Sequence, residues 1–114
     1  MNLSGLGVDI IEVKRFDAFE NNRDDRFLSD NFSPEELDYC FSFKNPAPHL
    51  AGTFAAKEAV FKTLGQDNLA LSSIEIKRNK KGQLTVWIKQ NCDQSVLVSI
   101  SHTAETAVAI AITL

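Results

Sequence analysis

Hydrophobic and polar positions follow a changing period along this chain, and each period predicts a kind of element. The first segment, Leu3 to Ile11, is apolar apart from Ser4 and Asp9, and it predicts a buried strand. From Glu12 to Phe19 the apolar residues recur about once per helical turn, which predicts a helix. The polar stretch from Asn21 to Asp25 predicts a loop.

Two more helices are indicated by the signals at their ends. Ser33-Pro34-Glu35-Glu36 combines a serine cap, a proline in the first turn and a glutamate at the third position, which favours a helix start. Asn45-Pro46-Ala47-Pro48 then breaks the chain. We expect a longer helix from about Leu50 to Leu64, with Gly65 as its C-cap.

Beyond Gly65 the period becomes two, which predicts strands. Two alternating segments flank the polar turn Asn79-Lys80-Lys81-Gly82, and together they predict a hairpin. Two later strands are joined by a connection from His102 to Glu105. The alternating apolar positions of the four strands are Ile74, Ile76; Leu84, Val86, Ile88; Val96, Val98, Ile100; and Val108, Ile110, Ile112. The order predicts an α+β fold, with one long helix and short helices packed on an antiparallel sheet.

Size and composition narrow the class of protein. The chain has 114 residues, of which 44% are hydrophobic, and we expect one globular domain over residues 1–114. It has no apolar run long enough to span a bilayer, and its start lacks the features of a signal peptide, so we expect a cytoplasmic protein. The net charge of −3 disfavours broad binding to nucleic acid. Cys40 and Cys92 lack metal-ligand spacing, and we expect both to be reduced and structural.

Four polar residues, at three places along the chain, are candidates for chemistry. Asp9 lies in an apolar strand, where a carboxylate needs a cation, a metal or several donors, although it could also cap the next helix. Glu58 and Lys62 share one face of the long helix and could hold a metal-bound phosphate or form an ordinary surface pair. His102, between Ser101 and Thr103, could donate a hydrogen bond to a phosphate, or it could be an exposed polar residue without a functional role.

Basic residues form two groups, and a solvated surface is the default interpretation of both. One group could also receive an acidic protein partner: Lys14, Arg15, Arg23 and Arg26. The other crowds the hairpin: Lys77, Arg78, Lys80 and Lys81. The sequence has no P-loop, no dinucleotide-binding glycine pattern and no nucleophile elbow, so nothing in it suggests nucleophilic catalysis.

Three signatures in this order resemble those of phosphopantetheinyl transferases of the short holo-acyl-carrier-protein synthase type. They are Gly7-Val8-Asp9-Ile10 followed by Arg15, then Phe54-Ala55-Ala56-Lys57-Glu58-Ala59 with Lys62, then Ser99-Ile100-Ser101-His102. The resemblance extends from Leu6 to Ile112. It implies transfer of the phosphopantetheine arm of coenzyme A to a serine of an apo acyl carrier protein, with magnesium as the metal and adenosine bisphosphate as the leaving product.

The resemblance also implies roles, position by position. Asp9 and Glu58 would hold Mg²⁺, Lys62 would neutralise charge on the phosphates, and His102 would bind a phosphate oxygen. Either Glu58 or a water on the metal could accept the proton of the serine. The residues expected to face the acidic helix of the carrier protein are Arg15, Arg23 and Arg26. Because short family members form trimers with the active site between subunits, the resemblance implies a homotrimer. We expect no nucleic-acid or membrane partner.

One position departs from the family pattern. Thr53 stands where the family typically has an arginine that grips the nucleotide phosphates, and Lys44 or His49 could compensate as cofactor-binding residues. Two alternatives therefore remain open. The first is a catalytically impaired paralogue that binds a carrier protein or a nucleotide without transfer. The second is a structural subunit whose charged residues form surface pairs.

Overall fold

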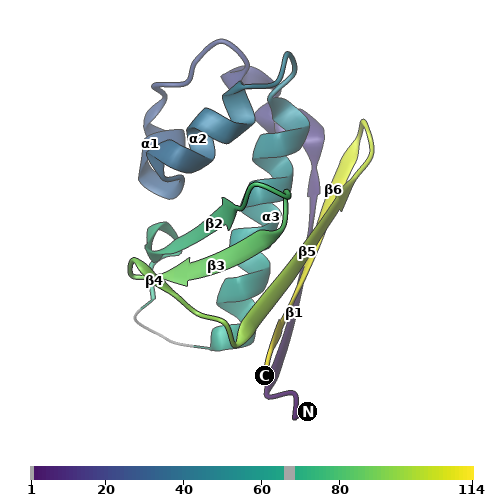
Figure 1. Cartoon of the computed structure of the whole chain (residues 1–114). Coiled ribbons are helices and arrows are strands. Elements are labelled where there is room, and N and C mark those ends of the chain that lie inside the picture. Colours follow the sequence, from purple (N-terminus) through teal and green to yellow (C-terminus); the bar gives the residue numbers. More distant parts are fainter. Residues whose placement is uncertain (1, 66–68) are drawn as a thin grey trace.

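The long helix of the protein lies between two small antiparallel sheets (Figure 1). The computed structural model describes residues 2–65 and 69–114. The larger sheet has the strand order β1-β6-β5, and the smaller one has the order β2-β3-β4. Helices α1 and α2 lie together near one end of α3 (Figure 1). The predicted α+β fold is confirmed.

The elements follow the chain in a simple order. The N-terminal half contains β1 (Gly5–Glu12), a 3₁₀ helix η1 (Val13–Phe19), α1 (Arg26–Asn31), α2 (Pro34–Phe41) and α3 (Ala47–Leu64). The C-terminal half contains a 3₁₀ turn η2 (Leu71–Ser73), β2 (Ile74–Arg78), β3 (Leu84–Ile88), β4 (Asn91–Cys92), β5 (Val96–His102) and β6 (Thr106–Thr113). No helix within the described ranges is both long enough and apolar enough to cross a membrane.

The capping and termination residues predicted for the helices are present. Ser33 and Glu36 form the predicted capping box of α2, and Gly65 ends α3 in the left-handed conformation with φ 61°. Helix α3 begins at Ala47, three residues earlier than predicted, because a proline is tolerated in the first helical turn. The segment expected to be an α-helix from Glu12 to Phe19 is instead the 3₁₀ helix η1. Helix α1 has no counterpart among the predicted elements.

Helix α3 approaches the larger sheet closely because the facing residues are small. Ala107, Ala109 and Ala111 of β6 are buried beneath it. A Cβ atom on Gly7 of β1 would lie only 2.1 Å from the backbone oxygen of Ala59. Glycine is therefore required where the strand and the helix meet. This close contact brings the first half of β1 against the C-terminal half of α3.

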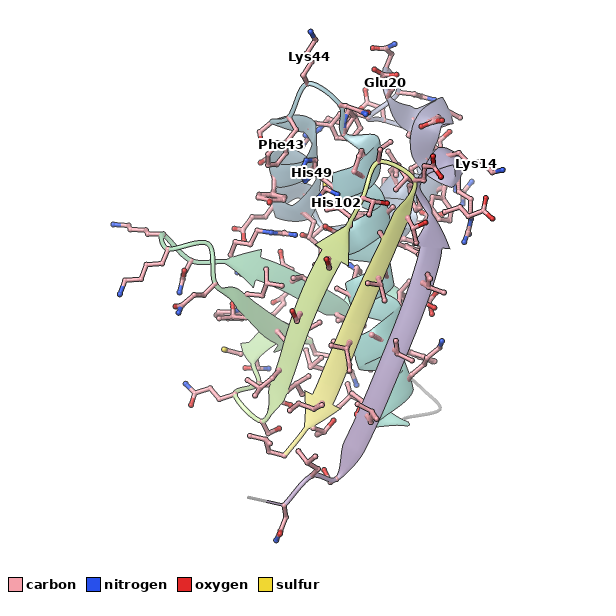
Figure 2. The ribbon with its side chains drawn as sticks, turned by 90° about the vertical axis from the view of Figure 1, so that its right-hand side faces the viewer. Lys14, Glu20, Phe43, Lys44, His49 and His102 are labelled. Carbon is pink, nitrogen blue, oxygen red and sulfur yellow. The ribbon has the colours of Figure 1, made fainter. Side chains whose placement is uncertain are left out.

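Helix α3 covers only one face of the larger sheet. The prediction that Leu3–Ile11 is buried is therefore wrong for those residues of the segment whose side chains point away from α3. The strand forms, but its residues alternate between α3 and solvent because side chains alternate along a strand. Figure 2 looks onto the uncovered side, here called the outer face. Its large apolar residues are exposed by 36 to 69%: Leu6, Val8, Ile10, Leu97, Val108 and Ile110.

The predicted hairpin and the two later strands are present, but they do not form one continuous meander. Strands β2 and β3 pair in antiparallel register around the turn, as predicted. Strands β5 and β6 instead pair in the other sheet, where β6 also pairs with β1. The pairing of β1, near the N-terminus, with β6, near the C-terminus, divides the strands between two sheets.

A buried ion pair joins α2, α3 and β2. Lys57 Nζ lies 2.7 Å from Glu36 Oε1, and both side chains are fully buried. The other carboxylate oxygen of Glu36 accepts a hydrogen bond from the backbone N–H of Ile76 at 2.8 Å. Burial lowers the pKa of Lys57, and the charge of Glu36 opposes that shift. The pattern of the sequence did not predict this pair, because buried lysines are rare.

Candidate active site

Asp9, Glu58 and Lys62 come together where β1 meets α3. Lys62 Nζ donates to Asp9 Oδ1 at 3.2 Å and to the backbone oxygen of Val8 at 2.9 Å. Glu58 lies one helical turn before Lys62 and within the electrostatic reach of Asp9. Among the ion pairs of the described residues, Lys62 therefore bonds to Asp9 of the strand and not to Glu58 of its own helix.

The environment of Glu58 disfavours its negative charge. Its pKa is raised, first by burial and then by the negative charge of Asp9. The positive charges of Lys62 and Arg15 act in the opposite direction. A cation shared by the two carboxylates would offset the repulsion between them, and carboxyl groups of perturbed pKa concentrate at functional sites.

We expect Glu58→Gln to raise the melting temperature near pH 7 by a few degrees at most. The folded pKa of Glu58 is raised, so the stability that this group contributes is complete below its unfolded pKa of about 4.3 and is lost as pH rises through the folded pKa. Thermal unfolding at pH 4 and pH 7 measures the difference, which should vanish at pH 4. Glu20→Gln, at an exposed position, serves as the control. A lower melting temperature of Glu58→Gln at pH 7 would contradict the assigned cause.

His102 lies at the opposite edge of the same sheet. Strand β6 separates β1 from β5, and its Ala109 pairs with Asp9 on one side and with Ile100 on the other. Two strand spacings, about 10 Å, therefore separate β1 from the strand that carries His102. Within one chain the structure does not bring His102 to the acidic pair.

His102 instead belongs to a second group of residues on the β5 side of α3. Its ring centroid lies 5.3 Å from that of His49, which stacks on Phe43 at 3.5 Å. Figure 2 shows both histidines at the same end of the sheet, with Lys14 on the opposite side. Lys44 is exposed on the loop after α2, and its side chain points away from the histidines (Figure 2).

A pocket of about 390 Å³ opens beside the histidines, and we call it the β5-side pocket. It is lined by residues of α2, α3 and both sheets, among them Tyr39, His49, Thr53, Arg78 and His102. Thr53, the position that departs from the family pattern, is fully buried at its wall. Arg78 was grouped above with the solvated hairpin residues, but it is half-buried here. Its alternation with Ile74 and Ile76 on β2 was the available signal, since the three share one face.

The arginines proposed for a protein partner have different surroundings. Arg15 is exposed beside a shallow apolar notch that includes Phe19 and Phe27. Arg23 is already paired with Asp38 of α2. Arg26 is highly exposed and lies 3.5 Å from Asp30. Arg15 and Arg26 are therefore better placed to accept a partner's charge than Arg23.

Both cysteines are free thiols, as expected. Cys40 is buried, and burial raises its pKa to about 11. The thiol is thus uncharged near neutral pH and unreactive. Cys92 is exposed on β4.

The acidic pair suits a metal that needs few protein ligands. Over residues 2–65 and 69–114, no cluster of three or more His, Cys, Asp or Glu side chains could hold an ion by itself. Asp9 and Glu58 offer only oxygen ligands, and the ammonium of Lys62 already occupies a cation position on Asp9. Mg²⁺ is commonly bound by one or two carboxylates together with substrate phosphates and water, so this donor set fits it.

The fold and this arrangement match a known class of protein. Residues 5–113 match the sequence profile of the 4'-phosphopantetheinyl transferase superfamily. A holo-[acyl-carrier-protein] synthase of Thermodesulfovibrio yellowstonii is 41% identical over 108 residues, covering 94% of this chain and 95% of the relative. One from Chlamydia trachomatis is 42% identical over 115 residues, covering 95% and 97%. The chain belongs to the 4'-phosphopantetheinyl transferase superfamily and, within it, to the holo-[acyl-carrier-protein] synthase type.

Solved structures agree in fold. A holo-(acyl-carrier-protein) synthase from Bacillus anthracis, in complex with CoA (3',5'-ADP), is 27% identical with a TM-score of 0.79, and the match covers 97% of this chain and 96% of that one. The synthase from Helicobacter pylori, in complex with coenzyme A, is 28% identical with a TM-score of 0.80, covering 96% and 99%.

Proposed function

We propose that this protein transfers the phosphopantetheine arm of coenzyme A to a serine of an apo acyl carrier protein, releasing adenosine 3',5'-bisphosphate. The observation that carries the proposal is the Asp9–Glu58–Lys62 group in a member of the holo-[acyl-carrier-protein] synthase type. Two related structures contain coenzyme A or its bisphosphate product. The serine oxygen attacks the phosphorus on the pantetheine side of the diphosphate, and the bond from that phosphorus to the bridging oxygen breaks as the phosphodiester forms. The serine proton passes to Glu58 or to a water molecule.

Asp9 and Glu58 would hold Mg²⁺ against the diphosphate of coenzyme A. Bound there, the ion would offset the negative charge that grows on the departing phosphate. Lys62, with its side chain half exposed, can donate to a phosphate oxygen as well as to Asp9. Lys62 and the ion would thus compensate the charge of the diphosphate from two sides, and Asp9 and Glu58 would hold the ion.

We further propose that three copies of the chain assemble so that each active site lies between two subunits. Two observations support this assembly. The outer face is a contiguous apolar surface, and such surfaces in soluble proteins mark interaction sites. Asp9 and Glu58 lie at one edge of the sheet, and His102 lies at the other, so a neighbouring subunit can supply the half that each chain lacks. His102 would then bind a phosphate held by the acidic pair of its neighbour.

Acyl carrier proteins present an acidic helix, and Arg15, just after β1, offers a complementary charge. Arg15 is exposed there, within electrostatic range of Glu58, and Phe27 beside it is 37% exposed. Charges of this kind chiefly speed the encounter and select the partner. The carrier serine would thereby be guided to Asp9 and Glu58.

The test is the mass of an apo acyl carrier protein after incubation with this protein, coenzyme A and Mg²⁺. We expect a gain of one phosphopantetheine that disappears when the metal is chelated. Glu58→Gln should reduce the transfer rate by at least about 100-fold, because it removes one of the two carboxylates that would hold the metal ion against the phosphates.

Glu20→Gln is the matched control, since it makes the same chemical change at an exposed site. It should transfer at the rate of the unaltered protein. Transfer by Glu58→Gln at that rate would refute the role of Glu58, and no transfer by the unaltered protein to any carrier would favour the impaired paralogue.

A further inference from the structure

The β5-side pocket contains an arginine held in place by its neighbours. The guanidinium carbon of Arg78 lies 3.6 Å from the centroid of the Tyr39 ring. Its Nη2 donates to Thr53 Oγ1 at 3.3 Å. A guanidinium carries five N–H donors, so one hydrogen bond and one stacked face leave most of them available.

The pocket carries positive charge without a carboxylate to balance it. No Asp or Glu is among the residues that line it, and Arg78 takes part in none of the ion pairs found in the described parts of the chain. His49 and His102 lie on its wall. The pKa of His49 is lowered by burial and then by the charges of His102 and Arg78, which indicates a positive potential. Such a pocket favours an anion.

The elements around Arg78 are joined by a buried ion pair. The buried pair of Glu36 and Lys57, with its bond to Ile76, joins α2, α3 and β2. Tyr39 and Thr53 lie about one helical turn from that pair, on α2 and α3 respectively. The junction that sets the spacing of the three elements therefore also sets the position of the arginine, which reduces the entropy lost when a ligand binds.

We propose that Arg78 binds a phosphate group of coenzyme A and supplies the guanidinium that Thr53 does not. This inference rests on the proposed function for the identity of the ligand. A threonine at position 53 is short enough to leave room in the pocket, and its hydroxyl aims the arginine of β2 into the same space. Coenzyme A offers two phosphate sources, the 3'-phosphate of its ribose and its diphosphate. Arg78 is a binding residue, and Thr53 and Tyr39 are positioning residues.

The first test is the binding of adenosine 3',5'-bisphosphate to the intact protein, measured by calorimetry. We expect Arg78→Gln to weaken binding by about 10- to 100-fold, since a hydrogen bond to a charged group is lost. Glutamine is polar and uncharged, and the substitution leaves the buried pair of Glu36 and Lys57 untouched, so the fold should be retained. Lys80→Ala is the control, because it removes one positive charge from an exposed position of the same hairpin. Equal affinity of Arg78→Gln and the unaltered protein, or equal loss in Lys80→Ala, would overturn the inference.

The second test compares transfer from coenzyme A and from dephospho-coenzyme A. If Arg78 binds the 3'-phosphate, Arg78→Gln should raise the KM for coenzyme A alone. If it binds the diphosphate, the KM for both donors should rise. Unchanged KM values for both donors would refute the proposal. The calorimetric test measures binding and does not depend on transfer. Failure of the proposed function would appear as absence of transfer by the unaltered protein, so the two failures can be told apart.

The positioning role of Thr53 has its own readout. Thr53→Val removes the hydroxyl that accepts from Arg78 while keeping the shape of the side chain. We expect Thr53→Val to raise the KM for coenzyme A with little change in kcat. Adding Thr53→Arg to the Arg78→Gln variant should restore affinity for the bisphosphate, because the new arginine enters the same pocket. Failure of that double variant to regain affinity, with its fold intact by circular dichroism, would contradict the equivalence of the two positions.

Discussion

A mixture of two inactive variants, Asp9→Ala and His102→Ala, should regain transfer activity. Each variant alone lacks one half of every active site, since the two halves lie at opposite edges of the sheet. If neighbouring subunits share a site, random assembly of an equal mixture restores about one quarter of the sites in a closed ring. The two variants are unfolded together, refolded and assayed by the mass gain of an apo acyl carrier protein.

The matched control mixes Asp9→Ala with Glu58→Ala. These residues belong to the same half of the site, so no arrangement of subunits restores an intact one. This second mixture should stay inactive. Recovery in the control, or no recovery in the first mixture when both variants refold to trimers, would contradict a site shared between subunits.

Lys57→Met should destabilise the fold by about 3–5 kcal/mol. The substitution leaves the carboxylate of Glu36 buried without its cation, because both side chains are fully buried in the native protein. Urea unfolding at one protein concentration measures the change, since an assembly makes stability depend on concentration. Arg26→Ala removes one partner of an exposed pair and should change stability by less than about 1 kcal/mol.

A second variant separates the loss of the pair from the loss of packing. Adding Glu36→Gln to Lys57→Met removes the unpaired charge while keeping an acceptor for the backbone N–H of Ile76. We expect the double variant to recover most of the lost stability. A double variant as unstable as Lys57→Met would mean that packing, and not the unpaired carboxylate, causes the loss.

Much of the fold could be predicted because its signals are local. The capping box at Ser33 and the left-handed glycine at Gly65 act within one helical turn, and both are present. The hairpin around residues 79–82 and the strands β5 and β6 follow from alternation over a few residues. Helix α1 was missed because it is six residues long and has no apolar repeat to indicate it.

The candidate site was predictable only in part. The spacing of Glu58 and Lys62 places them on one helix face, and their approach to Asp9 follows once α3 packs on β1. The sequence placed Arg78 among solvated hairpin residues, because its neighbours there are lysines on or beside an exposed turn. The position of Arg78 in the pocket depends on contacts with Tyr39 and Thr53, which come from two other elements.

The sequence by itself determined the elements, their order and the family resemblance, because propensities, caps and motifs depend on neighbours along the chain. Only the tertiary structure decided which strands share a sheet, which face of β1 remains uncovered, and that Lys57 is buried against Glu36. It also separated His102 from Asp9 and placed Arg78 in the pocket. These outcomes depend on strand pairing and close packing between residues far apart in sequence, which no local pattern specifies.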